Sequence, residues 1–107
     1  MKVKKEVLDR CITFEQHMQE VLKDKEYQQE YLRLHIEEFA QNGDYSSFFR
    51  SLERVVQART TVSQLARDLK MNRSNLSNIL HGRVRPSFAT TVKILQGLGA
   101  TIEVKFA

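Results

Sequence analysis

The chain has 107 residues, of which 17 are Lys or Arg and 13 are Asp or Glu, and its formal net charge is +4. This length suits one domain with a single hydrophobic core, and it is too short for a regulator with a separate ligand-sensing domain. The lone cysteine, Cys11, excludes an internal disulfide and fits a reducing cytoplasm. No apolar run approaches the roughly 18 residues of a membrane span, and the charged first residues lack the apolar stretch of a signal peptide. We therefore expect a cytoplasmic protein that does not bind membranes.

Charge is distributed unevenly along the chain. Residues 1–58 contain nine basic and eleven acidic side chains, whereas residues 59–107 contain eight basic and two acidic ones. A basic half suits a polyanion such as nucleic acid. A mildly acidic half suits either a basic protein or an ordinary solvated surface. The two halves are therefore expected to face different partners.

Helical spacing predicts three helices in the acidic half. Thr13 could cap a short first helix, and Asp24 begins a second one that ends at Asn42, before Gly43. Asp44 caps the third helix. The expected apolar side of the second helix comprises Tyr27, Tyr31, Leu32, Leu34, Ile36 and Phe39. The third helix has the cleanest apolar stripe, and we expect it to be the hydrophobic base of the fold: Tyr45, Phe48, Phe49, Leu52, Val55 and Val56.

Residues 61–80 predict two short helices joined by a tight turn. Thr61 and Gln64 have the spacing of a capping box for the first helix. Ala66 is a small residue where the two helices cross, and it lets their backbones approach closely. Met71 fills the turn. The inner faces of the pair comprise Leu65, Ala66, Leu69, Leu76, Ile79 and Leu80.

The outer face of the second short helix has the chemistry of a DNA-reading surface. Arg73, Ser74, Ser77 and Asn78 fall on one side of this helix. Arginine can grip the two acceptors of guanine, asparagine can pair with adenine, and serine can contact either edge. Asn72 caps the helix, whose positive end would then lie near DNA phosphates. The alternative is an ordinary helical hairpin with a polar surface.

A basic loop, Arg83-Val84-Arg85-Pro86, follows this helix after Gly82. Its arginines are either phosphate contacts, which position a protein without reading sequence, or simply solvated charges. The residues expected to contact phosphate are Ser63, Gln64, Asn72, Asn75, Arg83 and Arg85. A last helix begins at Pro86 and Ser87 and ends at Gly99. Its expected inward residues are Phe88, Val92, Leu95 and Leu98.

Residues 101–106 alternate polar and apolar side chains, which is the pattern of a β-strand. A lone strand needs a ladder partner. The candidates are the same strand of a second copy, across a two-fold axis, or the segment of residues 2–7. The first option predicts a homodimer with Ile102, Val104 and Phe106 at its interface. Such a dimer would read a palindromic double-stranded operator whose half-sites lie roughly 34 Å apart.

Chemistry of other kinds has little support in the sequence. His17, His35, His81 and Cys11 show no close ligand spacing, so we expect no metal site. No phosphate loop, nucleophile elbow or other catalytic motif is present. We therefore expect a binding protein that is not an enzyme and uses no cofactor.

Residues 61–98 resemble the helix-turn-helix of the Xre/Cro phage-repressor family, in which a Gln-Leu-Ala stretch, a turn and a Ser/Asn-rich second helix recur. Lys70 stands where that family usually has glycine, so a non-glycine residue there must accept a left-handed or nearly left-handed backbone. Residues 22–106 also resemble short Xre-type antidotes of addiction modules. That likeness lies in Leu22 to Tyr27, Glu30-Tyr31-Leu32, Gly43-Asp44 and Leu52 to Arg59, in this order.

The second resemblance implies an antitoxin that binds its own promoter as a dimer and neutralises a RelE-like ribonuclease toxin. The toxin is expected to contact the acidic half, where exposed Glu26, Glu30, Glu37 and Glu38 would complement a basic protein. Two alternatives remain open. One is a phage-type or stand-alone helix-turn-helix regulator without a toxin, and the other is an interaction adaptor that has lost DNA binding.

Together these patterns predict an all-α fold of five to six helices with a lambda-repressor-like helix-turn-helix and a short C-terminal β-strand. Residues 1–107 are expected to form one domain. Within it, residues 1–59 form an N-terminal helical part that binds the toxin, residues 60–100 form the DNA-binding part, and residues 101–107 form the strand that pairs across a dimer.

Overall fold

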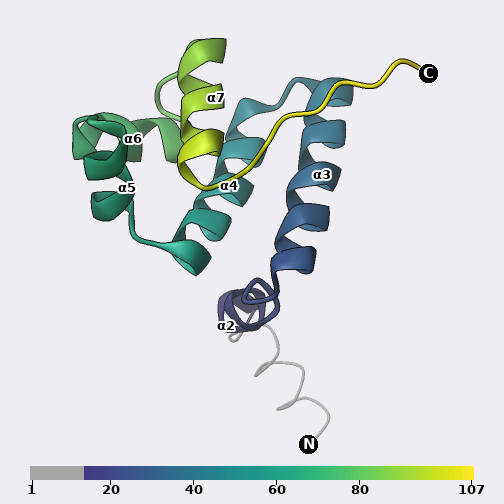
Figure 1. Ribbon diagram of the computed structural model, residues 1–107, viewed down its shortest axis with the longest axis horizontal. Helices are drawn as coiled ribbons and strands as arrows, with labels where there is room; N and C mark the ends of the chain where they lie inside the picture. Colours follow the sequence, from purple (N-terminus) through teal and green to yellow (C-terminus); the bar gives the residue numbers. More distant parts are fainter. Residues whose placement is uncertain (1–13) are drawn as a thin grey trace, which may run out of the picture.

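A computed structural model describes residues 14–107 of the protein, and this part of the chain is helical (Figure 1). Cys11, the cap at Thr13 and the segment 2–7 lie outside the described residues. The expected helix order is found. The helices are α2 (Phe14–Val21), α3 (Lys25–Asn42), α4 (Tyr45–Arg59), α5 (Val62–Leu69), α6 (Arg73–Leu80) and α7 (Phe88–Gly97). None of these helices is long and apolar enough to cross a membrane.

The predicted C-terminal strand is wrong. Residues 101–107 are described, and they leave the end of α7 as an irregular segment without strand hydrogen bonds (Figure 1). A strand exists only where a second strand accepts and donates its backbone hydrogen bonds, and residues 14–107 contain no strand to do so. The alternation of polar and apolar residues over 101–106 was therefore not sufficient evidence for a strand. Its apolar residues are exposed: Ile102 by 50%, Val104 by 79% and Phe106 by 97%.

Helix α4 is the base of the fold, as its apolar stripe predicts. It packs against α2, α3, α5 and α6. Figure 1 shows α3 antiparallel to α4 on one side, with α5, α6 and α7 on the other. Phe49, Leu52 and Val56 are almost completely buried and belong to the same hydrophobic cluster as Leu65, Leu76 and Ile94. The main core therefore joins α4 to the three helices that follow it.

Helix α3 is less buried than the sequence predicts. Leu34 and Ile36, expected on its apolar side, are 55% and 44% exposed, and the buried residue of this helix is Gln28. Leu32 and Phe39 pack against the main core only in part. Helix α3 has α4 as its one extensive contact among the described elements, so much of its circumference faces solvent.

Helix α2 is held by a small second cluster and by one arginine. Met18 and Leu22 pack on Val55 of α4. Arg54 donates from Nη2 to Glu15 Oε1 (2.6 Å) and from Nη1 to the Tyr31 hydroxyl (3.1 Å). These hydrogen bonds raise the pKa of the Arg54 guanidinium above its ordinary value, since both favour the charged form. One side chain on α4 thus ties α2 and α3 to the base.

Helix α7 is attached on one side and open on the other. Gly97 allows its close approach to α5, because a Cβ atom there would lie 2.6 Å from Leu69 Cδ2. Ile94, Leu95 and Leu98 are buried, but Phe88, expected to face inward, is 81% exposed. The prediction that Phe88 faces inward is therefore wrong, whereas Leu95 and Leu98 are buried as expected.

Candidate nucleic-acid interface

The turn between α5 and α6 is closed by backbone hydrogen bonds around Lys70. This residue adopts the left-handed conformation, with φ of 55° and ψ of 41°. The Lys70 N–H donates to the carbonyls of Ala66 and Arg67, and the Met71 N–H donates to the Ala66 carbonyl at 2.8 Å. These bonds use carbonyls that the end of a helix would leave without partners. The left-handed backbone predicted for Lys70 is confirmed.

Helix α6 begins at an effective N-cap. The Asn72 side chain accepts hydrogen bonds from the backbone N–H groups of Ser74 (2.8 Å) and Asn75 (3.3 Å). The predicted inner residues Leu76, Ile79 and Leu80 are all buried. Burial of that stripe fixes the rotation of α6 about its axis, so the opposite face points to solvent.

The four side chains predicted to read bases lie together on the outside of α6. Arg73, Ser74, Ser77 and Asn78 line one shallow hollow with Arg83 of the basic loop, and its volume is about 280 Å³. We call the first four residues the polar face of α6. Asn78 is held by Arg83, whose Nη1 donates to the Asn78 Oδ1 atom at 3.3 Å. The hollow is therefore lined by donors and acceptors and by two cations.

His81 joins the end of α6 to α4. Its Nδ1 atom lies 2.7 Å from the Ser77 carbonyl oxygen and 3.3 Å from the Ser77 hydroxyl, and its Nε2 atom lies 3.4 Å from Glu53 Oε2. These contacts give His81 a supporting role that its weighing as a metal ligand did not predict. Its location directly after α6, one helical turn from Ser77, was the available signal for this supporting role.

The residues expected to contact phosphate lie in the first turn of α5, at the start of α6 and along it, and in the basic loop. Thr61 accepts from the Gln64 N–H at 3.0 Å, as a capping box requires, but the Gln64 side chain donates to Asp68 at 2.8 Å. Ser63 and Gln64 lie in the first turn of α5. Asn75 turns away from the polar face of α6 toward α7.

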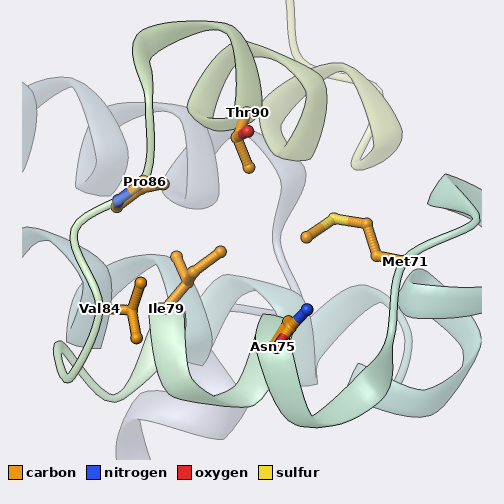
Figure 2. Close-up of a pocket in the computed structure, with 6 residues that line it drawn as sticks. All are labelled: Met71, Asn75, Ile79, Val84, Pro86 and Thr90. Carbon is orange, nitrogen blue, oxygen red and sulfur yellow. The ribbon is translucent and has the colours of Figure 1, made fainter.

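Asn75 lines a pocket of about 340 Å³ between α6 and α7 (Figure 2). Figure 2 shows Asn75 and Ile79 on α6 opposite Thr90 on α7, with Val84 and Pro86 at one end and Met71 at the other. The pocket belongs to the flank of the α5–α6 pair. Four of its six lining residues are apolar, whereas the hollow on the outer face of α6 has a polar lining.

The basic loop rests on the first turn of α4. A Cβ atom at Gly82 would lie 2.9 Å from the Ser46 Oγ atom and 3.2 Å from the Ser46 Cα atom, so only glycine fits without a shift. Gly82 also has a φ of 74°, which favours glycine. Arg85 lies over the ring of Tyr45, with its Cζ atom 4.1 Å from the ring centroid. Tyr45 was predicted only as a core residue, and this contact was missed.

The acidic face of α3 is partly neutralised by its own arginine. Arg33 donates to Glu30 Oε2 at 2.8 Å and to Glu37 Oε1 at 2.7 Å. The Arg33 hydrogen bond and charge hold the pKa of the exposed Glu30 carboxyl below its ordinary value. Glu30 is charged at neutral pH, but the positive charge of Arg33 offsets part of its negative potential.

Comparison with known proteins places the chain in a family. Residues 12–106 match the model of a family described as "probable addiction module antidote protein". A protein of Haemophilus influenzae strain Rd, described as uncharacterized, is 30% identical over 77 residues, which are 72% of this chain and 78% of that protein. No solved structure matches it significantly. The chain therefore belongs to the family of probable addiction module antidote proteins, which suggests an antitoxin role and implies a toxin partner.

Proposed function

We propose that this antidote protein is a helix-turn-helix regulator of the Xre type that binds and represses the operator of its own module. The observation that carries the proposal is the polar face of α6, where four side chains of base-reading type gather beside Arg83. Arg73 and Asn78 can each form bidentate pairs with base edges in the major groove. The buried stripe on the opposite side leaves this face at the surface of the protein.

Phosphate contacts would come from four places around the polar face of α6. The N-terminus of α6, capped by Asn72, offers backbone N–H groups and the positive end of a helix dipole. Ser63 and Gln64 at the start of α5, Asn75 on the flank of α6, and Arg83 and Arg85 in the basic loop complete the set. Such contacts fix the position of the protein on the duplex and supply most of its salt-dependent affinity.

The functional unit that we propose is a homodimer on a palindromic operator. One α6 reads only a few base pairs, and two copies on adjacent half-sites combine their affinities. The exposed Ile102, Val104 and Phe106 leave apolar surface that a second copy would cover. This assignment requires burial of these side chains and no particular secondary structure.

The toxin surface would lie on α2 and α3, away from the polar face of α6. Glu26, Glu30, Glu37 and Glu38 of α3 are exposed, and the partner that we propose is a basic, RelE-like ribonuclease toxin. Complementary charge would mainly raise the association rate and the selectivity of the complex. Separate surfaces would let toxin and DNA bind at the same time.

A gel-shift titration tests the operator proposal. The full chain is titrated against duplex DNA from upstream of its own gene and against a random-sequence duplex of the same length, at equal salt. We expect a discrete complex on the upstream DNA at concentrations at least about a thousandfold lower than on random DNA. Equal affinity for both duplexes would contradict operator recognition, and absence of binding to either would contradict DNA binding altogether.

A further inference from the structure

The side chain of Arg85 is held by an aromatic ring. Its Cζ atom lies 4.1 Å from the centroid of Tyr45, which is within the roughly 6 Å reach of a cation–π contact. Arg85 has no ion pair within residues 14–107, and the neighbouring carboxylate of Asp44 accepts a hydrogen bond from the Ser47 N–H. In the described part of the chain, the ring is thus the group that holds this guanidinium.

The ring of Tyr45 is itself fixed in the fold. It meets Phe39 of α3 edge to face, with centroids 4.6 Å apart, and it stacks on Phe49 with centroids 5.9 Å apart and an angle of 16° between the planes. Phe49 is only 1% exposed. Tyr45 thus packs against aromatic rings of both α3 and α4, and Arg85 lies on a ring that the fold holds from two sides.

The backbone of the basic loop is fixed at the same place. Gly82 packs on Ser46, the residue after Tyr45. The N–H of Gly82 donates to the Ile79 carbonyl, and the N–H of Arg83 donates to the Asn78 carbonyl at 2.9 Å. The start of the loop and the end of the Arg85 side chain thus rest on the same first turn of α4.

We propose that Tyr45 is a positioning residue for DNA binding, because its ring holds Arg85 in place for a contact with the phosphate backbone. This inference rests on the proposed DNA-binding function. A guanidinium stacked on a ring keeps the N–H donors along its edge available for phosphate. An arginine that is ordered before binding also loses less side-chain entropy when the complex forms.

Arg83 provides the internal comparison. It lies on the same loop and carries the same charge, but within residues 14–107 its side chain is held by a single hydrogen bond to Asn78 at 3.3 Å and by no aromatic ring. If stacking matters for DNA binding, replacing arginine by lysine should cost more at position 85 than at position 83. Lysine keeps the charge but loses the planar fork that stacks.

The test is a double-mutant cycle on the full chain, with a short random-sequence duplex as the probe. Binding is measured by fluorescence anisotropy over a range of NaCl concentrations for the wild type, Tyr45→Leu, Arg85→Ala and the double variant. We expect Tyr45→Leu to weaken binding about two- to fivefold, with a slope of log K against log salt reduced by up to about one. In the Arg85→Ala background, the same change should have almost no further effect.

Three further variants, Tyr45→Phe, Arg85→Lys and Arg83→Lys, distinguish loss of Arg85 positioning from damage to the core. Tyr45→Phe keeps the ring and should restore binding, while Tyr45→Leu is checked for a cooperative thermal transition. Arg85 is exposed, so Arg85→Lys should fold regardless, and it should weaken binding more than Arg83→Lys does.

Equal effects of Tyr45→Leu with and without Arg85 would overturn the proposal, because Tyr45 would then act only through the core. Equal losses for Arg85→Lys and Arg83→Lys would also overturn it. A wild-type chain that binds no duplex at low salt would instead refute the proposed function, so the two failures are distinguishable.

Discussion

The buried amide of Gln28 joins the C-terminal ends of two helices. Its Oε1 atom accepts a hydrogen bond from Arg59 Nη1 at 2.7 Å, and its Nε2 atom donates to the carbonyl of Leu22. Gln28 is 6% exposed and Leu22 is 1% exposed. The Gln28 side chain therefore gives the Leu22 carbonyl, directly after α2, a hydrogen-bond partner, and it holds Arg59 at the end of α4.

Gln28→Ala should destabilise the fold, because the Leu22 carbonyl would lose its partner in a buried place. We expect a decrease of about 1–3 kcal/mol in the free energy of unfolding, measured by urea denaturation. Gln29→Ala is the matched control: the neighbouring glutamine is exposed, and its change should stay within about 0.5 kcal/mol. Equal urea midpoints for the two variants would contradict the anchoring role of Gln28.

The left-handed backbone at Lys70 predicts a substitution that stabilises the fold. Lys70→Gly should raise the free energy of unfolding by up to about 1 kcal/mol, because glycine adopts a φ of 55° without the clash of a Cβ atom. Arg67→Gly, which also removes a basic side chain but lies inside α5, should lower the free energy of unfolding by about 1 kcal/mol. Thermal unfolding of the two variants side by side checks the pair. A loss of stability in both would mean that the turn carries no strain.

Much of the fold could be predicted because helix caps and helical periodicity, which depend only on nearby residues, indicate the same helices. The caps Asp24, Asp44 and Thr61 lie directly before their helices, and each accepts a backbone hydrogen bond. The residues on the polar face of α6 share one side because the helical period alone puts them there. The chain within residues 14–107 needs no distant contact to specify these features.

What could not be predicted depends on contacts between distant residues. Gln28 is buried where it contacts Leu22 and Arg59, and the spacing of residues within α3 cannot predict contacts to residues outside that helix. Tyr45 was assigned to the core by its helical stripe, but its ring also meets Arg85 far along the chain. The alternation of polar and apolar residues after Ala100 is a pattern that an irregular segment can also have. It could not show whether a second strand was present.

Direct base readout predicts a selective loss of affinity. Replacing Arg73 or Asn78 by Ala should cost roughly 1–3 kcal/mol on the operator and much less on random DNA. Ser74→Ala and Ser77→Ala should show the same selectivity with smaller effects. The measurement is parallel titration of both duplexes at fixed salt. Equal losses on the two would reassign these side chains to phosphate contacts.

Covering the exposed C-terminal residues should be part of dimer formation. A chain truncated after Ala100 loses Ile102, Val104 and Phe106, and we expect it to sediment as a monomer with much weaker operator binding. A milder variant, Phe106→Ser, keeps the backbone and should shift the monomer–dimer equilibrium in the same direction. Sedimentation velocity over a concentration series measures both. A truncated chain that remains a dimer would place the interface elsewhere.

The Arg33 ion pairs make the proposed toxin surface testable in two opposite directions. Arg33 lies between Glu30 and Glu37 and offsets part of their charge. Arg33→Gln should therefore make α3 more negative and speed association with a basic toxin, most clearly at low salt. The double variant Glu30→Gln/Glu37→Gln should slow association. Both changes should leave operator binding intact, and Lys93→Gln in α7 is the control with the same loss of one positive charge.

Stopped-flow association with the purified toxin of the module measures these rates, and a carboxyl NMR titration verifies the electrostatic cause. Arg33 lowers the pKa of Glu30 in the folded chain, so its contribution to stability is present at neutral pH and is lost as the pH falls through the folded pKa. Arg33→Gln should return that pKa toward its ordinary value. If Arg33→Gln changes the pKa of Glu30 but speeds association no more than Lys93→Gln does, the toxin binds another surface. If the partner binds a chain whose four α3 glutamates have been reversed to lysine as fast as the wild type, the acidic face of α3 has no part in the complex.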